Sequence, residues 1–338
     1  MKTHQKKIVA LLMAAMLVLC VVATVACTTN QPQDKVFEIT TDLKDFTTGE
    51  KEYTFTATAT YDNEACNVEV TSNGNQLMVK DGKYTVTFDK DGKYEIVIKA
   101  VSGQQSDSKK FVVTYSDGYL GQAIVSVEAF TVGCGYLVLP TYVNVYKDDN
   151  VAKLVDTAIK NANMTYVASG TIDENFYLTS VSGANLTGNV IDPVIKAALE
   201  GDKVAIDSES IVAKDGVWTL AAYDYCSKSG WMYTVNEVSP SVGMSEYKVK
   251  VGDVIRVQYS LDWGLDLSAV SEWATPVKKN DTNYNALNAL AALILSDNYC
   301  GKTADKFNEQ LTIVSKWDVT QAAIDGALKE LTDFYYGA

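Results

Sequence analysis

The sequence predicts a multi-domain fold: an all-β sandwich at residues 37–116, a mixed α+β domain at 122–267 and a small α-helical bundle at 280–338. Three observations predict this order. Apolar residues alternate with period two in short segments of the first part, strand and helix patterns mix in the second, and helical spacing takes over from residue 283.

The first 26 residues have the pattern of a signal peptide. Three lysines precede an apolar run from Ile8 to Val25, and Ala26-Cys27 closes the run before a polar segment. We therefore expect cleavage before Cys27, lipidation of that cysteine, a tether at 27–36, and a protein anchored on the extracellular face of the cell membrane. Thr24 stands where such sites usually carry leucine. An uncleaved helix is the alternative, since the run is about as long as a thin bilayer requires.

The sandwich is predicted from four segments that alternate or run apolar, at 53–61, 83–88, 93–101 and 109–115. Turn signals such as Asp81-Gly82 and Asp91-Gly92 separate them. The spacing resembles bacterial immunoglobulin-like or PKD-like spacer domains, without a cysteine–tryptophan pin. We expect a spacer, and ligand binding is the alternative.

The second domain is predicted to hold a helix at Val151–Ala162, capped by Asn150, and a shorter helix at Asp192–Glu200. From residue 231 to 235, aromatic and aliphatic residues alternate with Met232 and Thr234, which predicts a strand with one face on a core. Further strands are expected at Tyr247–Val251 and at 254–259.

Three helical faces follow, built on Leu287 to Ile294, Phe307 to Val314 and Ile324 to Tyr335. Asp318 with Gln321 has the spacing of a capping box, and Gly301 marks a break. The bundle is similar to helical repeats in many Gram-positive surface proteins, which act as spacers or lids.

The stretch SGWMYTVNEVSPSVGMSEYKVKVGDVIRVQYS, Ser229 to Ser260, resembles the C-terminal β-domain of the transcobalamin and intrinsic-factor family, whose bacterial relatives belong to surface proteins. The resemblance extends to Val125–Lys160 and Ser260–Ala269, and Glu237 and Val251 depart from its pattern. It implies a β-grasp-like α+β domain. It also implies half of a cobalamin site, since in that family the vitamin lies between this domain and a large helical barrel.

Composition argues against catalysis and against anionic partners. Beyond the expected cleavage site, 26 basic residues face 42 acidic ones, a net charge of −16, which disfavours nucleic acid as a partner. The single histidine, His4, falls in the segment expected to be removed. Histidine-based catalysis and most zinc sites are thereby disfavoured. We expect no catalytic residues, no metal, no cofactor and no enzyme activity.

Four cysteines remain beyond Cys27: Cys66, Cys134, Cys226 and Cys300. An exported protein could oxidise them. Cys134 and Cys226 fall in one expected domain and are the pair that could form a disulfide, with free, buried thiols as the alternative.

Aromatic residues are abundant, with 20 tyrosines and five tryptophans. Core packing is one explanation. In the other, Trp231, Tyr233 and Tyr177 line one rim of a site for a large, flat ligand, and Tyr136 is a further candidate.

Two functions follow as hypotheses. The first is a surface lipoprotein that binds a ligand without catalysis, with cobalamin or a related corrinoid as the ligand and a transporter as the partner. The second is an adhesion or cell-envelope scaffold protein that recognises a protein or a glycan of the envelope or host surface.

Overall fold

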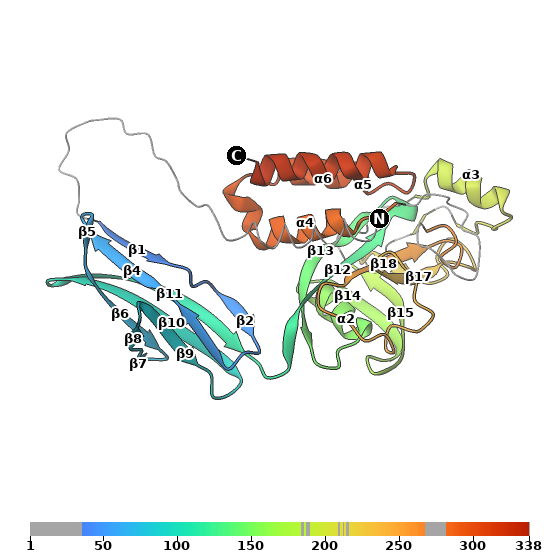
Figure 1. Ribbon diagram of the computed structural model, residues 1–338. Helices are drawn as coiled ribbons and strands as arrows, with labels where there is room; N and C mark the ends of the chain where they lie inside the picture. The colour runs from blue at the N-terminus through green and yellow to red at the C-terminus, as the bar shows by residue number, and fades with distance from the viewer. Residues whose placement is uncertain are drawn as a thin grey trace, which may run out of the picture.

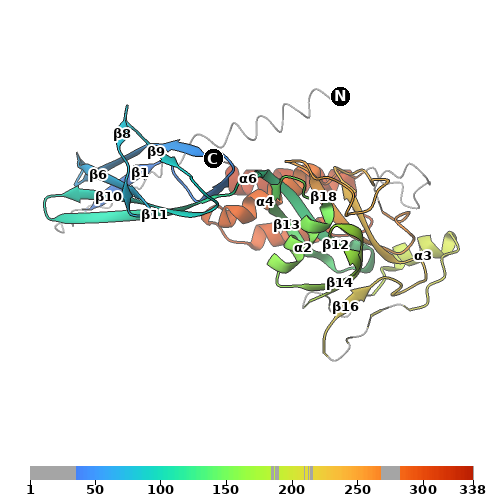
Figure 2. The same cartoon turned by 90° about the horizontal axis from the view of Figure 1, so that it is seen from below.

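The computed structural model describes residues 36–183, 186, 190–208, 210–211, 213, 216–267 and 282–337. The predicted signal peptide, the lipidation site Cys27 and the tether up to residue 35 lie outside the described residues. The chain is mostly β-sheet with helices at its C-terminal end, and this broad order was predicted from the sequence. A β-sandwich forms one end of an elongated molecule, and the other elements gather at the opposite end (Figures 1 and 2).

The sandwich consists of a five-stranded sheet, β2-β11-β10-β6-β7, and two three-stranded sheets, β1-β4-β5 and β3-β9-β8, around one apolar core. Its strands are β1 Phe37–Thr41, β2 Phe46–Thr48, β3 Glu52–Phe55, β4 Ala57–Tyr61, β5 Glu64–Ala65, β6 Asn67–Ser72, β7 Asn75–Gln76, β8 Val79–Lys80, β9 Lys83–Thr87, β10 Gly92–Ser102 and β11 Gln105–Tyr115. The segment predicted as one strand at 53–61 is broken at Thr56, whose N–H bonds the side chain of Asp42 instead of a strand partner. The chain thereby passes from one sheet to another.

The chain enters and leaves the sandwich at opposite ends. Phe37 pairs with Tyr61, and the hydroxyl of Tyr61 donates to the side chain of Gln105 at the start of β11. Tyr115, the last residue of β11, leads directly into the next part of the chain. Because β11 has 11 residues, the two ends are about 35 Å apart.

The second part is built on a four-stranded sheet of order β13-β12-β18-β17. Its strands are β12 Tyr119–Ala129, β13 Gly135–Tyr146, β17 Gly230–Val235 and β18 Val254–Ser260. The central pair, β12 and β18, is parallel, and the outer pairs are antiparallel. A short 3₁₀ helix, η2 Phe130–Val132, joins β12 to β13. A smaller sheet, β14-β15-β16, consists of Thr165–Thr171, Glu174–Ser182 and Thr219–Ala221.

Both helices predicted in this part are confirmed. Helix α2, Val151–Asn161, begins where Asn150 accepts the N–H of Lys153, and its apolar side joins the core under the sheet. Helix α3, Pro193–Gly201, begins where Asp192 accepts the N–H of Val194. Proline at its first position suits a helix start, because its missing N–H needs no partner there.

The C-terminal helices are also confirmed: α4 Asn285–Ser296, the 3₁₀ turn η3 Asn298–Gly301, α5 Asp305–Val314 and α6 Gln321–Tyr336. They cover the face of the sheet that α2 leaves open. Along β12, alternate residues face opposite sides: Val125 and Val127 join the core shared with α2, whereas Ile124 packs against Ala292 of α4. The helices lie over the sheet (Figure 1) and pack apolar side chains against it.

Two expectations from the sequence are wrong in this part. The segment from Trp231 to Val235 was expected to bury one face only, but Thr234 is buried and all of β18 is buried, because helices and the smaller sheet cover both faces. The strand expected at Tyr247–Val251 is absent. Lys248 makes one isolated bridge with Asn150, and the Lys250 N–H bonds the Asp253 side chain, so this segment is a loop.

The predicted start of the last helix is also corrected. Thr320, and not Asp318, is its N-cap: the Thr320 hydroxyl accepts the N–H of Ala323. Gly301 does end the turn after α4, with a positive φ of 72°.

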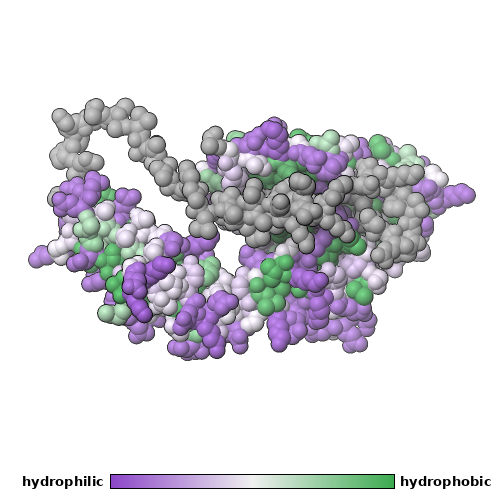
Figure 3. All heavy atoms as spheres, viewed as in Figure 1, coloured by the Kyte–Doolittle hydropathy of each residue, from purple (hydrophilic) through white to green (hydrophobic). Residues whose placement is uncertain are grey.

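The visible surface is mostly hydrophilic. Figure 3 shows small, separate hydrophobic groups among hydrophilic residues on the described part of this face. This pattern suits the strongly acidic composition, a formal net charge of −13 for the whole sequence.

Candidate functional site

A surface cavity of about 550 Å³ lies where the turn between β12 and β13 meets helix α5. One wall comes from η2 and the start of β13, and the other from α5 and the residues that follow it. Asp192, the cap of α3, adds a polar group at the edge. The lining residues are Phe130, Gly133, Cys134, Gly135, Tyr136, Leu139, Asp192, Asn308, Leu311, Thr312, Ser315, Lys316 and Trp317.

The glycines explain the shape of the first wall. Gly133 closes η2 with a φ of 73°, and Gly135 starts β13 with a φ of 68°. Side chains rarely adopt this left-handed backbone conformation, so the Gly-Cys-Gly sequence allows the chain to reverse tightly.

The rings of Phe130, Tyr136 and Trp317 supply most of the aromatic wall. Phe130 and Tyr136 pack edge to face with ring centroids 5.0 Å apart. The Tyr136 hydroxyl donates to Asn288 of α4 at 2.9 Å, and Trp317 Nε1 donates to the backbone oxygen of Asp266 at 2.7 Å. These bonds fix both rings, so the cavity is largely preformed.

The cavity carries one basic side chain, Lys316, and one acidic side chain, Asp192. Cys134 supplies a thiol, and burial raises the pKa of that thiol to about 12. It is therefore protonated near neutral pH and is a poor nucleophile, because thiolates carry cysteine reactivity. The lining suits shape recognition and hydrogen bonding better than covalent chemistry.

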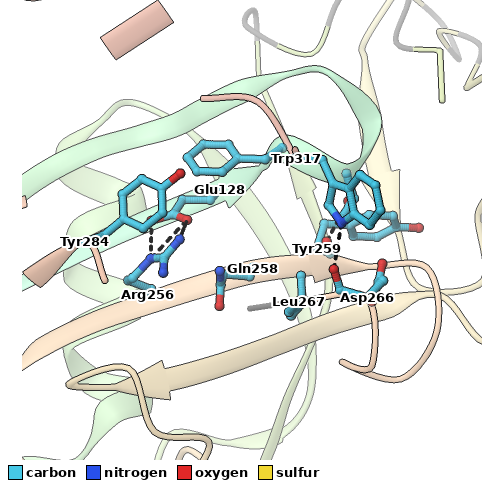
Figure 4. A pocket seen from close by; sticks show the side chains of 10 residues that line it. Glu128, Arg256, Gln258, Tyr259, Asp266, Leu267, Tyr284 and Trp317 are labelled. Atoms are coloured by element: carbon cyan, nitrogen blue, oxygen red, sulfur yellow. Dashed lines mark hydrogen bonds and ion pairs between the residues drawn. The ribbon is translucent and has the colours of Figure 1, made fainter. Parts of the chain in front are cut away.

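Behind the aromatic wall lies a buried charge cluster (Figure 4). Arg256 of β18 donates to Glu128 of β12, with Nη2 2.7 Å from Oε2, and its Nη1 lies 2.8 Å from Glu237 Oε2. The ring of Tyr284 covers the guanidinium at 4.0 Å. Burial alone would lower the pKa of Arg256, but Glu128 and Glu237 outweigh it and raise that pKa well above its ordinary value.

This cluster borders a small inner cavity of about 20 Å³, enough space for one water molecule. Phe130 and Trp317 line both this inner cavity and the outer one, so the two rings separate them. Both glutamates are held by the same guanidinium. The cluster is thus suited to joining the sheet to the helices and not to proton transfer.

The four aromatic residues predicted from the sequence do not form one rim. Trp231 is only 2 % exposed and donates its Nε1 hydrogen to Leu220 O at 3.4 Å, and Tyr233 is buried beside it in the same core. Tyr177 is partly exposed on β15. Tyr136 lies on the opposite face of the sheet with the helices, and it alone lines the cavity.

The proposed disulfide is not formed. All four described cysteines are free, including Cys134 and Cys226. The Cys226 thiol donates to Leu261 O at 3.0 Å in the core, whereas Cys134 lies at the cavity. The alternative of free, largely buried thiols is the one observed.

Sequence reasoning missed Phe130, Trp317 and the exposed side of α5. The cavity joins three segments that are distant in sequence, so no local spacing marks it. One usable signal was the charge of Glu128 and Arg256 within otherwise apolar strands, because a buried charge normally has a partner.

The described residues contain neither a candidate metal site nor a membrane-spanning helix. No group of three or more His, Cys, Asp or Glu residues there could hold a metal ion. In the same part of the chain, no helix has the length and apolar character needed to span a membrane.

Fold and cavity together define a mostly β-sheet protein of modular build, with a candidate site where its central sheet meets its C-terminal helices. A family model described as a domain of unknown function, DUF4430, matches residues 208–260. The match includes β17, β18 and the stretch Ser229–Ser260. No curated protein matches the chain.

Similar solved structures include a chimeric titin Z1Z2 functionalized with a KLER exogenous peptide from decorin, at 10% identity and a TM-score of 0.21, covering 67% of this chain and 95% of that one. Fibronectin(III)-like modules of Clostridium thermocellum CbhA give 9% identity, a TM-score of 0.22 and coverages of 67% and 95%. Domains 5-6 of the S-layer protein SbsC give 15% identity and a TM-score of 0.19, covering 67% of this chain and 99% of that one. With TM-scores this low, the immunoglobulin-like character of the first part rests on its own layered strands.

Proposed function

We propose that the chain is a non-catalytic ligand-binding protein, held on the extracellular face of the membrane by a lipid on Cys27. Its ligand site is the cavity beside Phe130, Tyr136 and Trp317. The observation that carries the proposal is this cavity of about 550 Å³ with three aromatic rings, two of them held by hydrogen bonds, and several polar side chains. That volume lies within the range of small-molecule sites.

The ligand we favour is a corrinoid, such as cobalamin. The strand order β13-β12-β18-β17, with a parallel central pair and α2 across one face, supports a β-grasp-like domain and the resemblance to the transcobalamin family. A corrin is flat, so one face can pack on fixed rings. Its amide side chains can bond polar groups such as Asn308, Thr312 and Ser315.

The cavity would cover only part of so large a ligand. A transporter subunit or another partner would then cover the rest and raise the affinity, since binding strength depends on how much of the ligand surface is buried. This arrangement predicts weak binding by the isolated protein and tighter binding with its partner.

Filling the cavity tests the proposal. Thr312 and Thr332 are both exposed helical threonines that donate to the carbonyl four residues earlier, but only Thr312 lines the cavity. Thr312→Trp should weaken cobalamin or cobinamide binding at least tenfold, and Thr332→Trp should leave it unchanged. Ligand absorbance and tryptophan fluorescence follow the titration, and thermal melting checks the fold. A wild-type titration that stays flat to millimolar ligand, with and without the transporter partner, would refute corrinoid binding.

The second candidate is an adhesion or envelope scaffold. It is favoured by the sandwich, which separates the point where the chain enters from the part that carries the cavity (Figure 1). A spacer of this kind suits a recognition domain that must reach beyond the membrane surface, whatever its ligand.

A further inference from the structure

Three exposed aromatic residues are carried by segments that meet at the far end of the central sheet. We call Tyr177, Tyr223 and Trp263 the aromatic platform. They are 39%, 70% and 58% exposed, and none of them lines the cavity. The platform is therefore a second, separate feature of the same domain.

Consecutive backbone carbonyls hold the two loops that carry Trp263 and Tyr223. The N–H of Trp263 donates to Lys228 O at 3.1 Å, and the N–H of Tyr223 donates to Ser229 O at 3.0 Å. Neighbouring Cα atoms are only 3.8 Å apart, so the two loops that carry these rings meet at the entry to β17.

Tyr177 reaches the same point from β15. A Cβ on Gly230 would lie 2.5 Å from the Tyr177 hydroxyl, so glycine at this position allows the phenol to approach. That hydroxyl bonds the backbone of Trp231. Burial, and to a smaller extent the neighbouring Tyr223, raise the pKa of Tyr177.

The backbone is strained at the platform. Tyr223 and Trp263 have φ values of 69° and 51°, in the left-handed region that aromatic residues rarely adopt. Strain of this kind persists where the surrounding structure holds it, and it is concentrated at functional sites. Nothing in the apolar core requires these two rings, because both point largely into solvent.

The platform has no excess of positive charge. Lys228 Nζ lies 2.9 Å from Asp262 Oδ1 and 5.7 Å from the centre of the Trp263 ring. Asp224, next to Tyr223, adds a carboxylate that accepts the N–H of Ala221. These groups do not favour a phosphate or a carboxylate as the ligand.

We propose that the aromatic platform binds the sugar rings of a neutral glycan chain. The apolar face of a pyranose presents C–H groups of slight positive character, which match the negative face of an aromatic ring. The tyrosine hydroxyls and the indole N–H can bond sugar hydroxyls at the ring edges.

The exposed area favours a glycan over a protein partner. At the exposures given, the three rings offer about 300 Å² of contact surface. A stable protein interface needs about 800 Å² on each side. The proposal shares with the proposed function only the premise of non-catalytic recognition, and it does not depend on the cavity.

The full-length protein can be tested by affinity electrophoresis against neutral polysaccharides, namely a β-1,3-glucan, a xyloglucan, a mannan and amylose, with polygalacturonate as an acidic control. We expect at least one neutral polysaccharide to slow the migration of the protein. Trp263→Ala and Tyr223→Ala should each weaken this effect at least tenfold without changing the melting temperature, and Trp263→Tyr should retain part of it. The matched control Tyr336→Ala removes a similarly exposed ring from α6 and should bind as wild type.

Wild-type protein that binds none of the neutral polymers, or platform variants that bind them as well as wild type, would overturn the assignment. So would Trp263-dependent retention of an envelope protein with no polysaccharide bound. The Thr312→Trp variant should bind the glycan normally. Loss of corrinoid binding and loss of glycan binding therefore report on two different sites.

Discussion

Arg256 is the single arginine of the chain, and it is fully buried. Removing a guanidinium from water is costly, and two carboxylates and a stacked ring compensate for that cost here. Glu237 also accepts the backbone N–H of Tyr284 at 2.7 Å. This one cluster therefore connects β12, β18, the loop after β17 and the start of α4.

Replacing Arg256 with methionine should destabilise the protein by about 3–5 kcal/mol, because Glu128 and Glu237 would remain buried without a counter-charge. Denaturant unfolding at neutral pH measures the loss. The double variant Arg256→Met, Glu128→Leu should recover part of it, since one stranded carboxylate is then removed. A single-variant loss below about 1 kcal/mol would show that the cluster is open to water.

Trp231 and Tyr223 lie in the same domain but should respond in opposite ways to truncation. Trp231→Ala should cost about 3–5 kcal/mol of unfolding free energy, since the indole is buried against Tyr259 and Leu220. Tyr223→Ala should change stability by about 0.5 kcal/mol or less, because its side chain is exposed. Thermal and urea unfolding of both variants checks this. Equal effects would contradict the assignment of Trp231 to the core.

At the scale of elements, the start of α6 offers a direct test of the corrected cap. Thr320→Ala should lower stability by about 1 kcal/mol, because the Ala323 N–H loses its side-chain acceptor. Asp318→Ala should change it by about 0.3 kcal/mol or less, since that side chain does not cap the helix. Urea unfolding distinguishes the two, and the reverse order would restore Asp318 as the cap.

The elements that could be predicted from the sequence are those with local signals. In the sandwich, one face of most strands meets solvent, so β9 alternates between exposed and buried residues as its sequence does. Helix α2 was predictable because Asn150 marks its start and one side is apolar. Strand β17 was assigned, but its burial was not, because no local sequence signal shows that Thr234 is buried.

The cavity could not be predicted for a related reason. Its aromatic wall combines Phe130, which begins the 3₁₀ helix η2, with Trp317, which lies in a link between two helices. Neither residue belongs to a periodic pattern. The most regular aromatic alternation, at Trp231 and Tyr233, instead marks the core, because strict alternation reports burial and not exposure to a ligand.

At the scale of the whole molecule, the cavity and the aromatic platform lie far from the place where the chain enters the sandwich. The chain enters the sandwich at Phe37 and leaves it at Tyr115, and β12 then runs away from that junction. Because β18 is parallel to β12, its last residue, Ser260, lies at the distal end, where it pairs with Gly230. The turn at Gly133 and the aromatic platform are therefore both held at the end opposite the sandwich.

The same arrangement predicts which parts of the chain can be removed. Deleting residues 282–338 would expose the sheet face that carries Ile124 and the Arg256 cluster, which α4 covers. We expect the shortened protein to lose cooperative unfolding and to aggregate, because exposed apolar area of this kind promotes association.

The matched deletion is residues 1–116, which removes a unit with a separate core. We expect that protein to unfold in one cooperative step. Its melting temperature should lie within a few degrees of the temperature at which the same residues unfold in the full chain. Calorimetry and size-exclusion chromatography measure both outcomes. Cooperative melting of the protein without its C-terminal helices would show that they are an independent domain and not the cover of the sheet.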